Sequence, residues 1–346
     1  MLSAACAPPV ASGDARGGIP FDASKPAEDA KSGASGDGGL QDVRDGEFGD
    51  AAGGLDGTTE RDSSDAPPSP DAEAIDGPSA EADAPDTGGI GTLWASPGLP
   101  PWDAPTLAHV HSVRASGTAM GNSGTVFAKM GDSITEYPPF LYEIGNGNYQ
   151  LGAYGALAAT ISQFTSTTLY DGSNSFNRYS DAAQAGWTSA DALGPPDAVT
   201  LEISEIHPAY AIVMFGTNDL ETDSVATYSG HMDTLVSQAE SAGVVVVLST
   251  IPDREDLAQG PQLVAQFNQA IMALAASRHL PLVDLFAALS SLPGQGLGPD
   301  QIHPSVEPLP DGGTTPADFT SAGLQYGFDV RNLLTVQALD RLRQIP

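Results

Sequence analysis

Four polar residues, at three places along the chain, have the types that acyl transfer requires. Ser133 lies in the string GDSIT, Asn218 in GTND, and Asp300 and His303 together in DQIH. A serine hydroxyl becomes an effective nucleophile when an imidazole takes its proton, and a carboxylate fixes the tautomer of that imidazole. An asparagine amide donates a hydrogen bond to the oxyanion of a tetrahedral intermediate. Because Asp precedes His by three residues, one short loop supplies both the base and the group that orients it.

Apolar runs precede two of these strings and predict buried strands. Such near-continuous β-branched and apolar runs, without alternation, are typical of parallel strands covered on both faces. Ser133 follows the first run and Asn218 follows the second. Sites in sheets of this kind lie beyond the carboxyl ends of the strands, so we expect the two side chains to meet there. The predicted strands are Thr125–Met130, Tyr210–Phe215, Val244–Ile251 and Leu280–Phe286.

Apolar residues at helical spacing occur between and after these strands. They predict helices over Tyr228–Ala239, with Gly243 as the C-cap, over Leu263–Leu274 and over Val330–Leu342. Strands that alternate with helices predict βαβ units and a doubly wound α/β sheet. Pro138 and Pro139 permit only a first turn or a broken helix directly behind Ser133.

The strings GDSIT, GTND and DQIH, in this order and at these separations, resemble the SGNH (GDSL-type) hydrolase family of esterases, lipases and acetylhydrolases. The resemblance covers about residues 120–345 and implies an α/β fold, a three-layer flavodoxin-like sandwich with a mainly parallel sheet. It implies that Ser133 is the nucleophile and that its backbone N–H is one oxyanion donor. Asn218 would be a second donor, His303 the base and then the acid, and Asp300 the partner of His303.

The family's remaining oxyanion donor is the backbone N–H of a glycine between the Ser and Asn strings. Gly186, in AGWTSADAL, resembles that position, although the usual Asn and first Gly upstream of it are missing. Together these roles imply a serine esterase that acts through a covalent acyl-enzyme on a short-chain or carbohydrate-borne ester, without cofactor or metal. An O-acyltransferase with a saccharide acceptor, and a binding protein that has lost turnover on the same scaffold, are the alternatives.

Other polar residues favour simpler interpretations. Asp219 is expected to be a cap or loop anchor, and His231 a surface residue of a helix. His109 and His111 form an H-x-H pair, but no further Cys or His pair nearby completes a metal site. The segment Asp253–Asp256 is expected to be a solvated loop, with a place at the substrate rim as the alternative.

Charge restricts the partners of the chain. It holds 13 Lys+Arg against 44 Asp+Glu, a formal net charge of −31, and the excess is acidic both in residues 1–90 and in residues 91–346. Such a chain would repel nucleic acid, which is bound through Lys and Arg contacts to phosphates. Anionic membrane surfaces are disfavoured for the same reason. A single Cys excludes a disulfide framework, and no run of 18 apolar residues predicts a transmembrane helix.

Residues 1–90 differ from the rest of the chain in composition. They contain only ten Leu, Ile, Val and Phe, too few to bury a core, and they predict a disordered acidic Gly/Ala/Asp/Pro-rich linker ahead of a hydrolase domain over 91–346. Cys6, in LSAACAPP, resembles the end of a bacterial lipoprotein signal peptide, which implies a lipidated membrane tether and an extracytoplasmic location. The basic and apolar regions of a signal peptide are absent, which a start upstream of Met1 would explain, and Leu2 lies one residue further from Cys6 than in the usual pattern. An ordinary thiol is the alternative.

Overall fold

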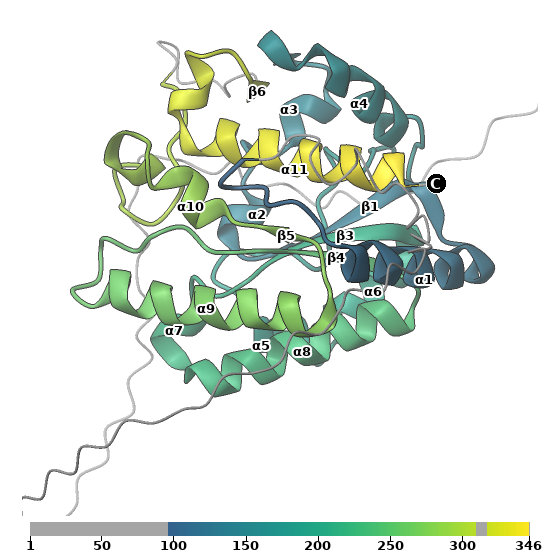
Figure 1. Cartoon of the computed structure of the whole chain (residues 1–346), viewed down its shortest axis with the longest axis horizontal. Helices are drawn as coiled ribbons and strands as arrows, with labels where there is room; N and C mark the ends of the chain where they lie inside the picture. The colour runs from purple at the N-terminus through teal and green to yellow at the C-terminus, as the bar shows by residue number, and fades with distance from the viewer. Residues whose placement is uncertain (1–95, 309–316, 346) are drawn as a thin grey trace, which may run out of the picture. The chain divides into compact units, whose positions relative to one another are not determined.

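The computed structural model describes residues 96–308 and 317–345, which form an α/β fold around a parallel sheet (Figure 1). The predicted linker over residues 1–90 and Cys6 lie outside the described residues. The sheet has the order β1-β3-β4-β5 and every neighbouring pair is parallel. Its strands are β1 (Ser123–Gly131), β3 (Pro208–Met214), β4 (Val245–Ser249) and β5 (Leu282–Val283).

A fifth segment extends the sheet beyond β1 at a single point. Ala183 forms a parallel bridge with Gly131, where the N–H of Gly131 donates to the carbonyl of Ala182 (3.0 Å) and the N–H of Gln184 donates to the carbonyl of Gly131 (3.2 Å). This segment follows β1 and precedes β3 in the chain but lies on the far side of β1. The spatial order is therefore that of a doubly wound, flavodoxin-like sheet, as the sequence predicts.

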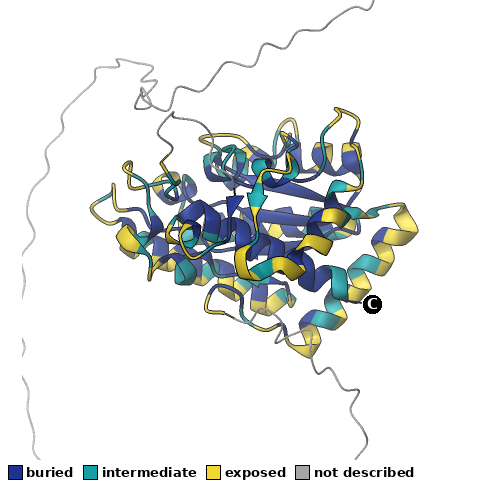
Figure 2. Cartoon of the chain, turned by 90° about the horizontal axis from the view of Figure 1, so that it is seen from above, coloured by how far each residue is buried: buried dark blue, intermediate teal, exposed yellow. Residues whose placement is uncertain are grey.

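Helices cover both faces of the sheet and complete the three layers (Figure 1). α4 (Ala158–Thr165) and α11 (Gly327–Gln344) pack on one face, while α6 (Ala198–Ile206), α8 (Val225–Ser241) and α9 (Gly260–Arg278) pack on the other. β3 and β4 are buried along their whole length, and the helices expose mainly their outer sides (Figure 2). Burial on both faces explains why the strands read as unbroken apolar runs.

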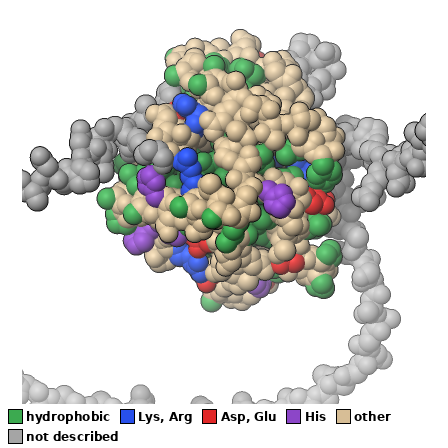
Figure 3. Space-filling model, turned by 90° about the vertical axis from the view of Figure 1, so that its right-hand side faces the viewer, with side chains coloured by type: hydrophobic (Ala, Val, Ile, Leu, Met, Phe, Trp, Pro, Cys, Tyr) green, Lys and Arg blue, Asp and Glu red, His purple; other side chains and the backbone are tan. Residues whose placement is uncertain are grey.

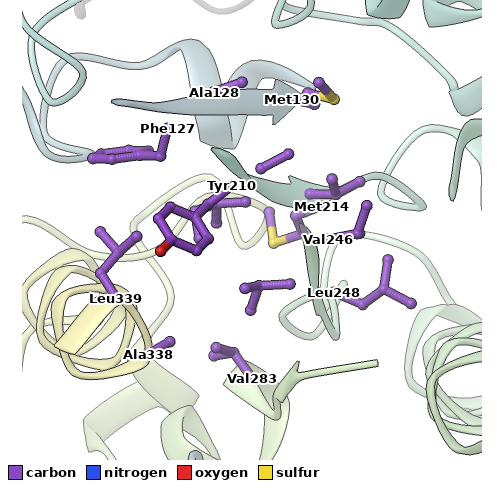
Figure 4. Packing of buried hydrophobic residues seen from close by; sticks show 14 of the residues in the cluster. Phe127, Ala128, Met130, Tyr210, Met214, Val246, Leu248, Val283, Ala338 and Leu339 are labelled. Carbon is purple, nitrogen blue, oxygen red and sulfur yellow. The ribbon is translucent and has the colours of Figure 1, made fainter. Parts of the chain in front are cut away.

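The core between the sheet and α11 is built from large apolar side chains. Leu339 and Ala338 of α11 face Tyr210 of β3 and Val283 of β5 (Figure 4), and all four are buried. Burying a Leu side chain contributes about 1.5–3 kcal/mol relative to leaving it exposed. This packing fixes α11 against the sheet, and α11 in turn supports the loops at the carboxyl ends of the strands.

One further long helix, α1 (Ala104–Met120), precedes the sheet in the chain. The other elements are short: α2 (Ser133–Glu136), α3 (Tyr142–Gly145), β2 (Tyr149–Gln150), η1 (Gly152–Leu157), α5 (Ser189–Ala192), α7 (Asp219–Thr222), α10 (Leu285–Leu289), η2 (Pro293–Gly296), β6 (Ala317–Asp318) and η3 (Gly323–Gln325). β2 and β6 pair in parallel as a separate two-stranded sheet.

Most elements expected from the sequence are confirmed, and one strand is wrong in extent. The apolar run Leu280–Phe286 forms a strand only at Leu282–Val283. Asp284 ends the strand, because its side chain accepts hydrogen bonds from the Ala287 N–H (3.1 Å) and the Thr250 hydroxyl (3.0 Å) and so caps α10. α2 has only four residues, as the two prolines behind it predict.

On the face drawn in Figure 3, hydrophobic, acidic and basic side chains are interspersed, and none of these types forms a large continuous patch. The exposed large hydrophobic residues are Met120, Tyr170, Tyr179, Leu201 and Met272. Among residues 96–308 and 317–345, no helix combines the length and the apolar character needed to cross a membrane.

α1 packs against the turn between α8 and β4 through two glycines. Gly243 was expected to be the C-cap of α8, but the C-cap is Ala242, and Gly243 follows it with φ +73°. A Cβ on Gly117 would overlap the carbonyl oxygen of Gly243. We expect Gly117→Ala to lower the free energy of unfolding by about 1–3 kcal/mol, the usual cost of overpacking, as measured by urea denaturation. Gly230→Ala is the matched control.

Gly230 lies within α8, is exposed, and has no atom within 4 Å of the position of an added Cβ. Its replacement by Ala is expected to stabilise the chain by about 0.5–1 kcal/mol, because alanine is the better helix former. Equal effects of the two substitutions would contradict close backbone packing at Gly117.

Candidate active site

Ser133 lies at the junction between β1 and α2. β1 ends at Gly131, and the intervening Asp132 is the N-cap of α2, where its Oδ1 accepts a hydrogen bond from the Ile134 N–H at 3.0 Å. Burial raises the pKa of Asp132 to about 6. Ser133 is half-buried and occupies the first position of the helix, where a backbone N–H has no acceptor within the helix.

His303 and Asp300 complete a hydrogen-bonded series with Ser133. Nε2 of His303 lies 2.8 Å from Oγ of Ser133, and Nδ1 of His303 lies 2.7 Å from Oδ2 of Asp300. Both distances lie within the range for hydrogen bonds. Residues 170 positions apart are thus joined in the order hydroxyl, imidazole, carboxylate.

The pKa of Asp300 is lowered to about 2. Partial burial acts in the opposite direction, but hydrogen bonds outweigh it: one comes from the His303 ring, and two come from the backbone N–H groups of Ile302 and His303, each at 3.1 Å from Oδ1. Hydrogen bonds to the charged form of a carboxyl group stabilise it. Asp300 is therefore an ionised partner for His303.

The loop that carries Asp300 and His303 is fixed by backbone hydrogen bonds. The N–H of Gly298 donates to the carbonyl of His303 (2.7 Å), and the N–H of Ser305 donates to the carbonyl of Gly296 (2.7 Å). The carbonyl of Ser305 accepts from the N–H of Phe328 at the start of α11 (3.0 Å). These contacts hold the loop between η2 and the helix that packs under the sheet.

The structure brings the Asn218 and Gly186 segments together. The side-chain amide of Asn218 donates to the carbonyl of Trp187 at 2.8 Å, and Trp187 directly follows Gly186. Gly186 lies three residues after the bridge between Ala183 and Gly131, and Asn218 lies four residues after β3 ends, beside β1. Both segments therefore leave the sheet at the carboxyl end from which Ser133 projects.

Three hydrogen-bond donors at these positions are left unused within the described part of the chain. They are the backbone N–H of Ser133, the backbone N–H of Gly186 and the second amide hydrogen of Asn218. Gly186 has φ +80°, a conformation that glycine adopts without steric cost, and it is exposed. Unused donors beside a nucleophile are what an oxyanion hole requires.

Asp219 anchors the loop that contains Gly186. Oδ1 of Asp219 accepts a hydrogen bond from the Ser189 N–H at 2.8 Å and a second, short one from the Ser189 hydroxyl. Asp219 is completely buried, and burial raises the pKa of its carboxyl group. This contact agrees with the loop anchor expected from the sequence.

Residues that the sequence did not single out hold the short helix behind Ser133. Arg331 of α11 is buried and donates to the Ile134 carbonyl (2.5 Å) and the Thr135 hydroxyl (2.9 Å). Asn332 donates to the Pro139 carbonyl at 2.9 Å. Because the prolines stop α2 after one turn, the carbonyls of this segment need hydrogen-bond donors from elsewhere, and α11 supplies them. The interruption of the helix by two prolines was the one sign in the sequence that this segment needs hydrogen-bond partners from elsewhere.

Two further contacts link the segments of the site. Oε2 of Glu136 accepts a hydrogen bond from the Ala185 N–H at 2.6 Å, next to Gly186. The side chain of Arg254 is buried and donates to the Thr217 carbonyl next to Asn218, and it pairs with Glu221 (2.7 Å). The expectation of a solvated loop over Asp253–Asp256 is therefore wrong for its first half, because Asp253 and Arg254 are buried, while Glu255 and Asp256 are exposed.

His109 lies far from this site in the fold. Its Nε2 contacts Oε1 of Glu240 on α8 at 2.5 Å, while His111 is exposed. One histidine of the pair therefore contacts α8, and the other faces solvent.

Comparison with known proteins places this chain in a family. The family model of the GDSL-like lipase/acylhydrolases matches residues 130–307, more than half of the chain, and the match spans all five predicted site residues. A comparison with curated proteins found no match.

Similar solved structures include the following three. A lipase/acylhydrolase from Enterococcus faecalis is 19% identical with a TM-score of 0.40, covering 61% of this chain and 92% of that one. A catalytic mutant of an acetylxylan esterase from Geobacillus stearothermophilus is 18% identical with a TM-score of 0.42, covering 63% and 95%. A GDSL-like lipase from Bacteroides thetaiotaomicron is 18% identical with a TM-score of 0.39, covering 68% and 98%. On the family match, the chain belongs to the GDSL-like lipase/acylhydrolase family and is a hydrolase that acts on ester bonds.

Proposed function

We propose that the chain is a serine esterase that works through a covalent acyl-enzyme. The observation that carries this proposal is the hydrogen-bonded series from Ser133 through His303 to Asp300, at 2.8 and 2.7 Å. The unused donors of Ser133, Gly186 and Asn218 add support, because they lie at the edge of the sheet where an oxyanion would form.

In the first half of the reaction, Oγ of Ser133 attacks the ester carbonyl carbon while Nε2 of His303 takes the hydroxyl proton. The electron pair of the carbonyl bond moves onto its oxygen, which accepts hydrogen bonds from the three donors. When the intermediate collapses, the bond to the leaving alcohol breaks and His303 protonates that alcohol. The acyl group stays on Ser133.

In the second half, water takes the place of the alcohol. His303 accepts a proton from the water, whose oxygen attacks the acyl carbon, and the same donors hold the second oxyanion. Collapse releases the carboxylic acid, and the proton returns from His303 to Oγ of Ser133. Asp300 stays ionised throughout, in agreement with its lowered pKa of about 2, and compensates the positive imidazolium in both halves.

For the substrate, we propose an ester with a short acyl group, either simple or carried by a saccharide. Support comes from the segment behind Ser133, where α2 stops after four residues at Pro138 and Pro139, and from the packing of this segment against Arg331. The chain turns there into buried structure instead of continuing as a long helix beside an acyl channel.

The test uses the full chain and p-nitrophenyl esters from acetate to dodecanoate, followed by acetylated xylan. We expect the highest kcat/KM on acetate or butyrate, and labelling of Ser133 by a fluorophosphonate, located by mass spectrometry of the modified peptide. A folded chain that hydrolyses none of these esters and takes no label at Ser133 would contradict the proposal. Acyl transfer to a saccharide in place of water would replace it by the transferase alternative.

Asn218→Ala is expected to lower kcat by about 10²- to 10³-fold with little change in KM, because an oxyanion donor acts mainly in the transition state. Steady-state kinetics on p-nitrophenyl acetate measure the effect. Circular dichroism and the urea midpoint check that loss of the contact with Trp187 leaves the fold intact. An unchanged kcat in a folded variant would remove Asn218 from the proposed oxyanion hole.

A further inference from the structure

Three potential metal ligands converge on the segment that follows Asn218. They are Asp219 in α7, Asp223 at the end of α7, and His231 in α8, and one ligand atom from each lies within 4.8 Å of the others. None of them belongs to the Ser133–His303–Asp300 series. The site proposed from them is thus independent of the proposed function.

Each of the three residues has a buried ligand atom that makes no hydrogen bond within the described part of the chain, although Nδ1 of His231 and Oδ2 of Asp223 lie within ion-pair distance of each other. Oδ2 of Asp219, Oδ2 of Asp223 and Nδ1 of His231 are inaccessible to solvent and have no hydrogen-bond partner among the described residues. Asp219 is completely buried as a residue. A buried polar atom without a hydrogen bond is unfavourable, so three such atoms at one point favour a ligand there.

The distance between two of the ligand atoms is that of neighbouring ligands on one zinc ion. Nδ1 of His231 and Oδ2 of Asp223 are 3.3 Å apart. Two ligands on one tetrahedral zinc ion, with bonds of about 2.0–2.1 Å, lie about 3.3 Å apart, whereas N–H···O hydrogen bonds are usually about 2.7–3.2 Å long. The other atoms of both side chains are partly exposed, 30% for His231 and 18% for Asp223, so these side chains have room to adjust.

Neither the Asp219 nor the Asp223 carboxylate forms an ion pair with a Lys or Arg side chain of the described residues, although nearby carboxylates are paired in this way, as Glu221 is with Arg254. Oδ1 of Asp219 is already held by Ser189, which orients the carboxyl group and leaves Oδ2 available. A ligand fixed by a second hydrogen bond in this way is usual around metal sites.

We propose that Asp219, Asp223 and His231 bind a divalent transition-metal cation, zinc by the spacing, with water as the fourth ligand. One imidazole nitrogen with two carboxylate oxygens suits Zn²⁺ and disfavours Ca²⁺, which takes six to eight oxygen ligands. The ion would join α7 to α8 directly behind Asn218. Its role would be structural, because none of its three ligands belongs to the Ser133–His303–Asp300 series.

The test is titration of the metal-free full chain with ZnCl₂ by calorimetry. We expect one site per chain and a Kd raised at least tenfold in Asp223→Asn and in His231→Ala, because each removes one ligand. Both residues are partly exposed, so the variants should stay folded. CaCl₂ is expected to give no comparable binding.

His111→Ala is the matched control, because the His109/His111 pair is the other place where zinc could bind. Its Kd for Zn²⁺ is expected to equal that of the unchanged chain. X-ray absorption of the Co²⁺-loaded chain gives a check that needs no variant, with one imidazole and otherwise oxygen ligands expected. Absence of stoichiometric binding, binding unchanged in both Asp223→Asn and His231→Ala, or two imidazoles at the ion would overturn the proposal.

Discussion

His303→Ala is expected to lower kcat for ester hydrolysis by about 10⁴- to 10⁶-fold, Ser133→Ala by a similar factor, and the double variant no further. The reason is the series of hydrogen bonds that joins the two side chains at 2.8 Å. Without the imidazole, the hydroxyl has no neighbouring base. Without the hydroxyl, the imidazole has no nucleophile attached to the chain. Either loss removes the acyl-enzyme route completely, so the second loss has nothing left to remove.

Steady-state kinetics on p-nitrophenyl acetate measure this effect, with urea denaturation to confirm that each variant folds. His111→Ala is the control, because His111 is exposed and lies in α1, away from the site. A His303→Ala variant within tenfold of the unchanged chain would contradict the assignment of the base. So would a double variant that is slower than the single variants by the product of their effects, because that result would mean that the two residues act independently.

The sequence predicted the parts of the fold that depend on local pattern. β3 and β4 are buried along their full length, and an apolar run without alternation is the direct consequence of that burial. The extent of β5 was wrong because a single side chain, that of Asp284, ends the strand and caps α10. The run of apolar letters continues through Phe286, so hydrophobicity alone does not reveal this boundary, although an acidic residue before LFAAL is a capping signal.

The sequence predicted the residues of the site that carry its chemistry, but not the residues that hold them in place. Strings at strand ends led to Ser133 and Asn218, because the strand ends of a parallel sheet meet at one edge. Asp300 and His303 came from the Asp-x-x-His pattern of a loop and from the family resemblance. The supporting contacts were missed. Arg331 reaches α2 across 197 positions of the chain, and Glu136 reaches Ala185 across 49. Such partners satisfy backbone groups of another segment, and nothing in the local spacing of either residue shows which segment that is.

The convergence of Asp219, Asp223 and His231 illustrates the same limit. Asp219 was expected to anchor a loop, and its contact with Ser189 does so. The sequence indicated a surface position for His231, which is consistent with its partial exposure. What the sequence did not indicate is that both residues bring a buried ligand atom close to Asp223, because that depends on how α7 and α8 are placed relative to each other.

Asp300→Asn is expected to lower kcat by about 10⁴-fold while leaving the loop in place. The amide oxygen of asparagine can still accept from the backbone N–H groups of Ile302 and His303, which Oδ1 of Asp300 holds at 3.1 Å. Its NH₂ group, however, would face Nδ1 of His303. That contact favours the tautomer with the proton on Nε2, and an imidazole in this form cannot accept the proton of Ser133. The charge that stabilises the imidazolium is lost as well.

The same substitution makes a prediction about stability. The pKa of Asp300 in the folded chain, about 2, lies below its ordinary value of 3.8. The carboxylate therefore contributes stability above about pH 4 that is lost progressively as the pH falls toward about 2. The difference in free energy of unfolding between the unchanged chain and Asp300→Asn should shrink over that interval, and solvent exposure of Asp300 should keep it small.

Kinetics on p-nitrophenyl acetate measure the effect of Asp300→Asn on kcat, and urea denaturation at several pH values measures its effect on stability. A fully active Asp300→Asn variant would show that His303 needs no carboxylate to orient it. A stability difference that grows on acidification would show instead that the hydrogen bonds around Asp300 do not favour its charged form.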